Sequence, residues 1–237
     1  MKTLIRHMST IALAATISSA PLFNSAFAAP DNGVKLLTAN FEAREVVTVE
    51  AGDFHFKPGQ IAPVHTHAAP AIGYVVKGAI IYQVEGEKPQ ILNEGDAFYE
   101  PVGPRILRFD NASATDEAIF IDFNLQQEGE PFIVFEEPLT EDIDRRTLPT
   151  TDLSGKRIDQ VNIYANELAG GDSLQLKTVR PMLGLVADGI VVIKVNGKAK
   201  QRIVAGKSFS IPKAGSKTTI QNVSSEVPAK LITFSLI

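Results

Sequence analysis

The 237-residue sequence predicts an all-β protein made of two tandem β-barrels that follow a cleaved signal peptide. Three observations lead to this fold class. Short runs of alternating apolar residues recur from residue 34 onward, separated by Gly, Pro, Asn and Asp. No segment after the N-terminal region shows a sustained 3.6-residue hydrophobic period. The second half of the chain also repeats the glycine and proline positions of the first half.

The N-terminal 28 residues have the order of features found in a secretory signal peptide. Lys2 and Arg6 give a positive region, residues 11–20 give an apolar core too short to span a bilayer, and residues 26–28 are the small Ala-Phe-Ala pattern that a signal peptidase reads. We expect cleavage before Ala29 and a secreted or periplasmic mature protein. The alternative is an uncleaved anchor helix, which is disfavoured because a proline interrupts the apolar run.

Charge and cysteine content exclude several classes of function. The full chain has a net charge of −4, and removal of residues 1–28 leaves 21 basic and 27 acidic residues, a charge of −6. A net acidic chain does not favour a nucleic-acid partner or, after signal cleavage, an anionic membrane partner. The chain has no Cys, which excludes disulfides, thiolate metal sites and cysteine nucleophiles.

Short runs of residues in the first half are expected to form strands because β-branched and aromatic residues dominate in them. Six examples are 46–49, 53–56, 79–85, 97–100, 106–109 and 118–123.

A constant offset of 111 residues relates the two halves without a gap. The matched positions include Gly73 and Gly184, Gly78 and Gly189, Gly95 and Gly206, Phe98 and Phe209, Pro101 and Pro212, Asn111 and Asn222, and Phe123 and Phe234. We therefore expect an N-terminal barrel over 29–127, an acidic connector over 128–152 and a C-terminal barrel over 153–237.

His65 and His67 form the most informative pair for chemistry. Residues i and i+2 of a strand point to one face, so both imidazoles would project side by side. Two imidazoles so placed can hold a divalent transition metal such as Fe, Mn, Ni or Zn. The alternative is a pair of surface or buried histidines without a metal.

The residues around this pair resemble the two sequence motifs of the cupin superfamily. The first motif is matched by Gly59, His65, His67 and Gly78, and the second by Gly95, Pro101, Gly103 and Asn111. The resemblance implies two double-stranded β-helix barrels of the jelly-roll type, a bicupin similar to secreted or periplasmic quercetin-dioxygenase-like cupins. It also implies a metal held by two His and a Glu of the first motif and a His of the second. Here Ala71 and Ile106 occupy the Glu position and the second-motif His position.

Gln83 is the expected substitute ligand, because some similar cupins carry a Gln on the strand that follows the Gly73–Gly78 turn. A solvent-facing Gln83 is the alternative. Tyr82 is expected to bind the ligand, and Arg105 and Arg108 to hold an anionic group, with a position on the barrel rim as the alternative for both arginines.

The second copy lacks the predicted metal ligands, since Leu176 and Thr178 replace the two histidines and Lys217 replaces Ile106. The sequence thus predicts an exported bicupin that binds a small molecule and one divalent transition metal in its N-terminal barrel. A dioxygenase-like oxidoreductase activity is the functional interpretation, with a homodimer as a further expectation. No catalytic residue and no organic cofactor are assigned. The alternative is a non-enzymatic, metal-free cupin that binds a small molecule or has a structural role.

Overall fold

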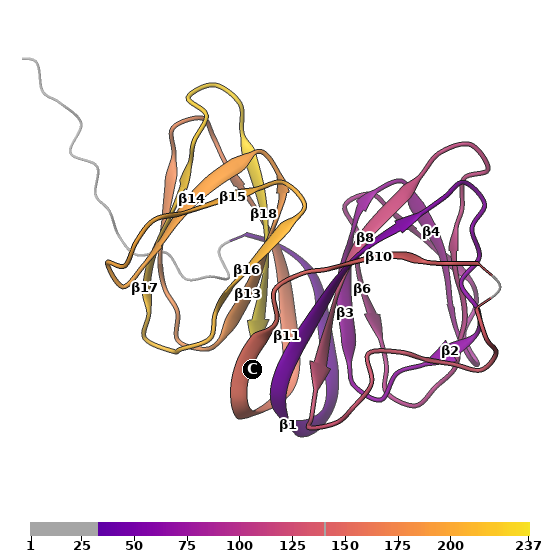
Figure 1. Ribbon diagram of the computed structural model, residues 1–237. Helices are drawn as coiled ribbons and strands as arrows, with labels where there is room; N and C mark the ends of the chain where they lie inside the picture. The colour runs from indigo at the N-terminus through magenta and orange to yellow at the C-terminus, as the bar shows by residue number, and fades with distance from the viewer. Residues whose placement is uncertain (1–32, 140) are drawn as a thin grey trace, which may run out of the picture.

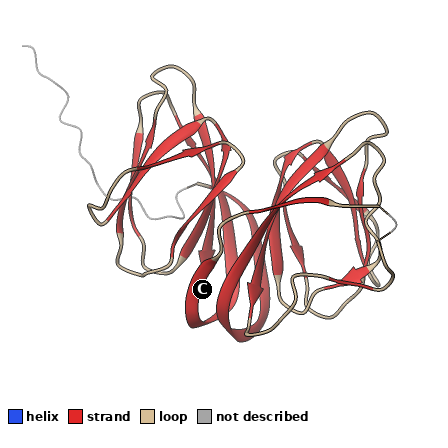
Figure 2. Ribbon diagram, in the orientation of Figure 1, coloured by secondary structure: helices blue, strands red, loops and turns tan. Residues whose placement is uncertain are grey.

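The computed structural model describes residues 33–139 and 141–237, and within these ranges the chain consists of strands, turns and loops without a helix (Figure 2). The predicted all-β class is confirmed. The predicted signal peptide, residues 1–28, lies outside the described residues. Within the described part of the chain, no helix has the length and hydrophobicity needed to cross a membrane.

The strands fall into two groups, one per barrel (Figure 1). The N-terminal group contains β1 (Val34–Phe56), β2 (His65–Thr66), β3 (Ala71–Lys77), β4 (Ala79–Val84), β5 (Gln90–Asn93), β6 (Ala97–Glu100), β7 (Ile106–Asn111), β8 (Ala118–Gln126), β9 (Val134–Phe135) and β10 (Asp144–Thr147). The C-terminal group contains β11 (Thr151–Leu168), β12 (Ser173–Lys177), β13 (Met182–Asp188), β14 (Ile190–Val195), β15 (Gln201–Val204), β16 (Lys207–Ile211), β17 (Lys217–Asn222) and β18 (Ala229–Leu236).

One nine-stranded sheet runs through both barrels, in the order β16-β13-β18-β11-β1-β8-β3-β6, with β10 paired to β1. The antiparallel pair β1–β11 joins its two halves, which explains why the barrels lie side by side in Figure 1. Each barrel is completed by a smaller sheet of its own. The order is β5-β4-β7-β2-β9 in the N-terminal barrel and β12-β17-β14-β15 in the C-terminal barrel.

Matched glycines show why the repeat keeps its pattern. A Cβ built on Gly73 would lie 2.2 Å from the ring of Phe98 on the neighbouring strand, and one built on Gly184 would lie 2.1 Å from Phe209. Since real Cβ contacts are never so short, only glycine fits at either position. The offset of 111 residues therefore reflects the same strand packing in both barrels.

The two barrels share a hydrophobic core between them. Phe123 and Phe234, which are matched by the repeat, pack ring to ring with centroids 4.8 Å apart. Both are almost fully buried, as are further matched pairs in this core, Ile72 with Leu183, Ile121 with Ile232 and Leu125 with Leu236. Each barrel thus covers the other with the same set of positions, and the interface has the self-complementary character of a twofold contact.

The segment between the barrels folds back over the N-terminal barrel. β9 pairs with β2, and β10 pairs with β1. The carboxylate-bearing residues of this segment are mostly exposed, as an acidic connector predicts, but Phe132 is buried in the core of the N-terminal barrel. The connector therefore closes the barrel next to the two histidines.

Candidate metal centre

The two histidines lie at the end of the barrel that the connector covers, and both are buried. The Nδ1 atom of His65 is 2.8 Å from the carbonyl oxygen of Pro63, and that of His67 is 3.1 Å from the carbonyl oxygen of Phe132. A carbonyl oxygen only accepts, so each Nδ1 carries the proton and donates it. In a neutral ring this leaves the Nε2 atom with a free lone pair, as in metal-binding histidines.

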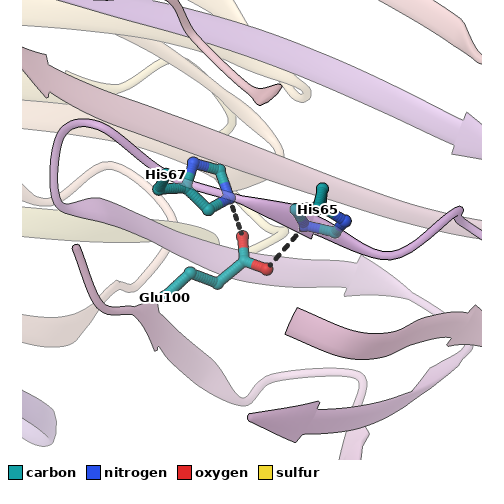
Figure 3. Close-up of side chains that lie close together, drawn as sticks. All are labelled: His65, His67 and Glu100. Carbon is teal, nitrogen blue, oxygen red and sulfur yellow. Dashed lines mark ion pairs between the residues drawn. The ribbon is translucent and has the colours of Figure 1, made fainter. Parts of the chain in front are cut away.

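Glu100 faces both lone pairs (Figure 3). Its two carboxylate oxygens lie 3.4 Å from the Nε2 atoms of His65 and His67, and possible ligand atoms of the three side chains lie within 4.8 Å of one another. The side chain of Glu100 is only 4% exposed. The Nε2 atom of His67 and the Oε1 atom of Glu100 make no hydrogen bond within the described residues, although both are buried.

The protonation equilibria of this cluster reflect burial and mutual charge. Burial alone would raise the pKa of Glu100, but the charges and hydrogen-bonding capacity of His67 and His65 outweigh it and lower that pKa to about 2. Burial likewise acts to lower the pKa of His67, and the charges of Glu100 and Asp122 turn the net shift upward. The carboxylate therefore stays ionised and attracts a positive charge, either a proton on His67 or a metal cation.

Asp122 adds a second buried carboxyl group beside this cluster. Burial, followed by the charge of Glu100, raises the pKa of Asp122 to about 8. Its Oδ1 atom has no hydrogen-bond partner within the described residues. Neighbouring Asn124 donates through Nδ2 to the carbonyl oxygen of Phe132, at 3.1 Å, which is the group that also orients His67.

The donor set fits a divalent transition metal. Two imidazole nitrogens and one carboxylate oxygen are the ligands that Fe, Mn, Ni and Zn use in proteins. Buried nitrogen and oxygen atoms with unused lone pairs destabilise the fold unless they find a partner. A cation between His65, His67 and Glu100 would be that partner. These three residues are the candidate ligands.

A small cavity of about 30 Å³ adjoins the cluster. Its lining is largely aromatic and contains no Lys or Arg; it consists of Phe54, Phe56, Ala62, His65, His67, Glu100, Phe109, Phe120, Asp122, Phe132, Ile133, Phe135 and Ile143. The volume is about that of one water molecule in the liquid.

Comparison with known proteins agrees with this fold. Residues 52–124 match the family model described as a cupin domain. The structure of AerE from Microcystis aeruginosa is similar, with a TM-score of 0.59 and 14% identity over 86% of this chain and 99% of that one. Vicilin from Capsicum annuum gives a TM-score of 0.59 at 12% identity, covering 81% and 76% of the two chains. A salicylate 1,2-dioxygenase from Pseudaminobacter salicylatoxidans gives 0.50 at 16% identity, covering 81% and 71%. No curated protein matches the sequence.

Residues 52–124, in the N-terminal barrel, thus match a cupin domain, and the two barrels together have a bicupin-like fold. The site departs from the expected ligand set in the source of the carboxylate. Ala71, at the expected Glu position, pairs across the strands with Glu100, so both side chains lie on the same face of the sheet. Glu100 thus takes the place of the missing motif residue from the neighbouring strand. Ile106 is the cross-strand partner of His65 and brings no ligand.

The expectation that Gln83 replaces the missing ligand requires a correction. Burial alternates along β4 so that Tyr82 and Val84 point into the barrel and Gln83 points outward. The amide of Gln83 donates to the carbonyl oxygen of Glu87 at 3.1 Å. The side chain of Gln83 therefore lies on the outer face of the strand, away from His65 and His67.

The three residues expected to bind a ligand lie apart from the cluster or are already engaged. Tyr82 is buried in the barrel, and its hydroxyl donates to the carbonyl oxygen of Tyr99 at 2.6 Å. Arg105 pairs with Glu136 on the surface, and Arg108 pairs with Asp110 at 2.7 Å. Neither arginine lines the cavity, which corresponds to the alternative of a position on the rim.

The C-terminal barrel has no ionisable side chain at the matched positions. The offset places Leu176 and Thr178 at the two histidines, Ile211 at Glu100 and Thr233 at Asp122, and all four are buried. None of these residues is a ligand for a transition metal of the kind described above.

Sequence reasoning missed Glu100 and Asp122, and a signal for Glu100 was present. In 97–100, Phe98 and Glu100 are two residues apart and therefore share a face. An acid on the same face as a large apolar residue would be buried and would need a positively charged partner. The matched residue Ile211 shows that the barrel itself accepts an apolar side chain there.

Proposed function

We propose that the N-terminal barrel holds one divalent transition metal through His65, His67 and Glu100, and that this barrel is a dioxygenase-like oxidoreductase site for a small molecule. The observation that carries the proposal is the buried cluster of two Nε2 lone pairs and one carboxylate, of which His67 Nε2 and Glu100 Oε1 lack any hydrogen-bond partner in the described structure. We also propose export to the periplasm or the exterior, and a homodimer, from the sequence alone.

Each side chain of the site has a definable role. The carbonyl oxygens of Pro63 and Phe132 fix the ring orientation and the tautomer of the two histidines. The phenylalanines around the cavity exclude bulk water, which strengthens electrostatic interactions inside. Asp122, with a pKa raised to about 8, holds a proton at neutral pH beside the cluster. A metal held by three protein ligands supplies Lewis-acid or redox chemistry at its open coordination positions.

The reaction class is chosen because a dioxygenase is among the proteins that share this fold, at a TM-score of 0.50. The ligand set also suits it, since two His and one carboxylate form the facial arrangement that is characteristic of non-haem iron oxygenases. The substrate is expected to be a small molecule, because the cavity beside the cluster has a largely apolar lining with a few polar groups. At about 30 Å³ the cavity must widen between its aromatic side chains before an organic substrate can enter.

Metal analysis of protein purified without chelators tests the proposal. We expect about one Fe, Mn, Ni or Zn per chain in the wild type and loss of the metal in the double variant His65→Ala, His67→Ala. The matched control is Glu136→Ala, because Glu136 is a surface carboxylate paired with Arg105. Absence of metal from a folded wild type, or unchanged metal in the double variant, would overturn the proposal.

A metal-free binding protein is the second candidate function, supported by a different feature. The raised pKa of His67 and the lowered pKa of Glu100 allow an imidazolium–carboxylate pair to satisfy the cluster with a proton alone. The aromatic lining would then contact a small apolar ligand, for which the cavity of about 30 Å³ must widen. If the wild type contains no metal after incubation with each of the four ions and dialysis, this function replaces the first.

A further inference from the structure

The surface of the protein carries two open clefts that the repeat relates to each other. Their volumes are about 670 Å³ in the N-terminal barrel and about 910 Å³ in the C-terminal barrel. The offset of 111 residues pairs their linings as Ala68 with Val179, Pro70 with Pro181, Tyr99 with Ser210, Pro101 with Pro212, and Val102 with Lys213. The two clefts are thus the same feature of the fold with different side chains.

The C-terminal cleft has gained positive charge. Lys156 stands at the position of Glu45, and Lys213 at that of Val102. Arg180 also lines this cleft, and Asp152 is its one carboxylate, so its formal charge is +2. In the N-terminal cleft, by contrast, Arg44 and Arg157 stand against the three carboxylates of Glu42, Glu45 and Glu130, a formal charge of −1.

The cations of the C-terminal cleft are not neutralised by the protein. Within the described residues, no acidic side chain pairs with Lys156, Arg180 or Lys213. The arginines of the N-terminal half behave differently, since each forms an ion pair; they are Arg44, Arg105, Arg108, Arg145 and Arg146. Positive charge without a counter-charge in a concave site attracts anions.

The whole C-terminal barrel enhances this field. Residues 153–237 contain 12 Lys and Arg against 5 Asp and Glu, a formal charge of +7, whereas residues 29–152 contain 9 against 22, a charge of −13. The overall acidity of the chain therefore belongs to the N-terminal barrel and the connector. An anion approaching the molecule is directed to the C-terminal barrel.

We propose that the C-terminal cleft is a binding site for a small organic anion, a phosphate ester in the first instance. The guanidinium group of Arg180 can hold two oxygens of the anion, with Lys156 and Lys213 as further charges. The hydroxyl groups of Thr150 and Ser210, which also line the cleft, are additional donors. Val179, Pro181, Pro212 and Ala214 provide an apolar wall for the organic part. This site does not depend on the metal centre, and it gives the second barrel a ligand of its own.

Phenyl phosphate is the probe for this proposal, titrated into the full chain and followed by calorimetry and by NMR shifts at low and physiological ionic strength. We expect saturable binding, with shifts at 150–156, 179–181 and 210–214. Arg180→Gln should weaken binding by about 10-fold to 100-fold, the range expected for charge-assisted hydrogen bonds. Arg180→Lys should also weaken it, because a lysine retains the charge but not the paired donors. Arg202→Gln is the control, since Arg202 is an exposed cation of the same barrel outside the cleft.

Several outcomes would overturn the proposal. One is equal weakening by Arg202→Gln and Arg180→Gln, which would indicate a general counter-ion effect. Another is binding of inorganic phosphate as tight as that of phenyl phosphate, which would leave the apolar wall without a role. Binding to vesicles of anionic lipid but not to phenyl phosphate would assign the basic barrel to a surface instead. Melting curves of each variant show whether the fold is intact.

Discussion

The Nε2 atom of His67 and the Oε2 atom of Glu100 lie 3.4 Å apart inside the N-terminal barrel, and both side chains are almost fully buried. The Nδ1 atom of His67, on the other edge of the ring, donates to the carbonyl oxygen of Phe132, so the Nε2 lone pair is directed at an ionised carboxylate. Two electron-rich groups at this distance repel each other unless a cation or a proton lies between them. This pair therefore requires a metal cation or a proton between its two groups.

Glu100→Gln is expected to weaken metal binding by at least about 100-fold. Loss of a residue that only hydrogen-bonds to a metal ligand lowers metal affinity by about 10-fold to 100-fold, and loss of a ligand itself should cost more. Titration of chelator-treated protein with Zn²⁺ or Mn²⁺ measures the change. Gln83→Ala is the matched control and should leave the affinity unchanged, since Gln83 points away from the cluster. Loss of binding in Gln83→Ala but not in Glu100→Gln would contradict this assignment.

Removal of the metal should make stability fall as the pH rises. Asp122 has a folded-state pKa raised to about 8, against 3.8 in the unfolded chain. Its contribution to the free energy of unfolding is therefore complete below pH 3.8 and is lost as the pH rises towards 8. The raised pKa of His67 acts with the same sign above pH 6.5. Each group gives a slope of at most about 1.4 kcal/mol per pH unit.

Urea unfolding with a chelator between pH 4 and pH 8 tests this dependence, with Asp122→Asn as the comparison. The stability of the wild type relative to Asp122→Asn should decline across this range, because the variant cannot titrate at that position. A difference that stays constant or increases with pH would show that Asp122 is ionised in the folded protein. Below pH 4.5 the lowered pKa of Glu100 gives the opposite trend, with stability lost as the pH falls towards 2.

The barrel fold could be predicted from the sequence because the glycines and prolines that separate its strands are local signals. Positions 73 and 184 accept only glycine, because a Cβ there would clash with a phenylalanine ring on the neighbouring strand. The spacing between the two glycines therefore reveals the repeat in the sequence. The length of β1 could not be predicted in this way. It runs from Val34 to Phe56, although local patterns predicted separate strands at 46–49 and 53–56, because pairing with β8, β10 and β11 keeps the chain extended between them.

The histidines of the site could be predicted from their spacing, and the carboxylate could not, because it comes from another strand. Glu100 is 33 residues after His67 and reaches it through the pairing of β3 with β6. The choice of Gln83 failed for a local reason, since a strand offers two faces and the sequence of β4 is apolar on both. Only the tertiary arrangement decides which polar residue of a barrel enters its interior.

Asn111→Ala and Asn222→Ala should destabilise the protein by similar amounts, each by roughly 3 kcal/mol, since each loss leaves buried carbonyl groups without a donor. The Nδ2 atom of Asn111 donates to the carbonyl oxygens of Phe56, Lys57 and Asp116. That of Asn222 makes the corresponding bonds in the C-terminal barrel, to Leu168, Ala169 and Val227. Denaturant unfolding measures the loss.

Asn93→Ala is the control, because the side chain of Asn93 is exposed, and it should change stability by less than about 0.5 kcal/mol. The same bonds predict that neither Asn-x-Ser sequence is glycosylated, since the amide nitrogen is buried and committed. A modified Asn111 or Asn222 in the folded protein, detected by mass spectrometry, would contradict these buried hydrogen bonds.

Export predicts a mature N-terminus at or near Ala29, because a positive region, an apolar core and a small-residue pattern occur in signal order. N-terminal sequencing of protein from its native compartment measures it. The control is a Lys2→Glu, Arg6→Glu variant, which should be exported more slowly because the positive region is lost. Cytoplasmic protein that begins with Met1 in the wild type would refute export.

The last prediction is that the two barrels divide stability and metal binding between them. Leu176 replaces His65 in the C-terminal barrel and is fully buried, so Leu176→Ala should lower the free energy of unfolding by about 2–5 kcal/mol. Because the C-terminal barrel contributes no residue to the cluster of His65, His67 and Glu100, the metal affinity of the folded variant should stay nearly unchanged. His65→Ala should do the reverse and cost metal affinity more than stability.

Melting curves of the metal-free forms and metal titrations of both variants separate these effects, since the first readout follows the fold and the second follows the site. A stabilising effect of metal on His65→Ala equal to that on the wild type would show that His65 is not a ligand. If Leu176→Ala melts normally but no longer binds metal, the C-terminal barrel takes part in the metal site and the division is wrong. A fall in both stability and affinity in Leu176→Ala would instead mean that the shared core transmits the damage, which the variant Phe234→Leu would reproduce.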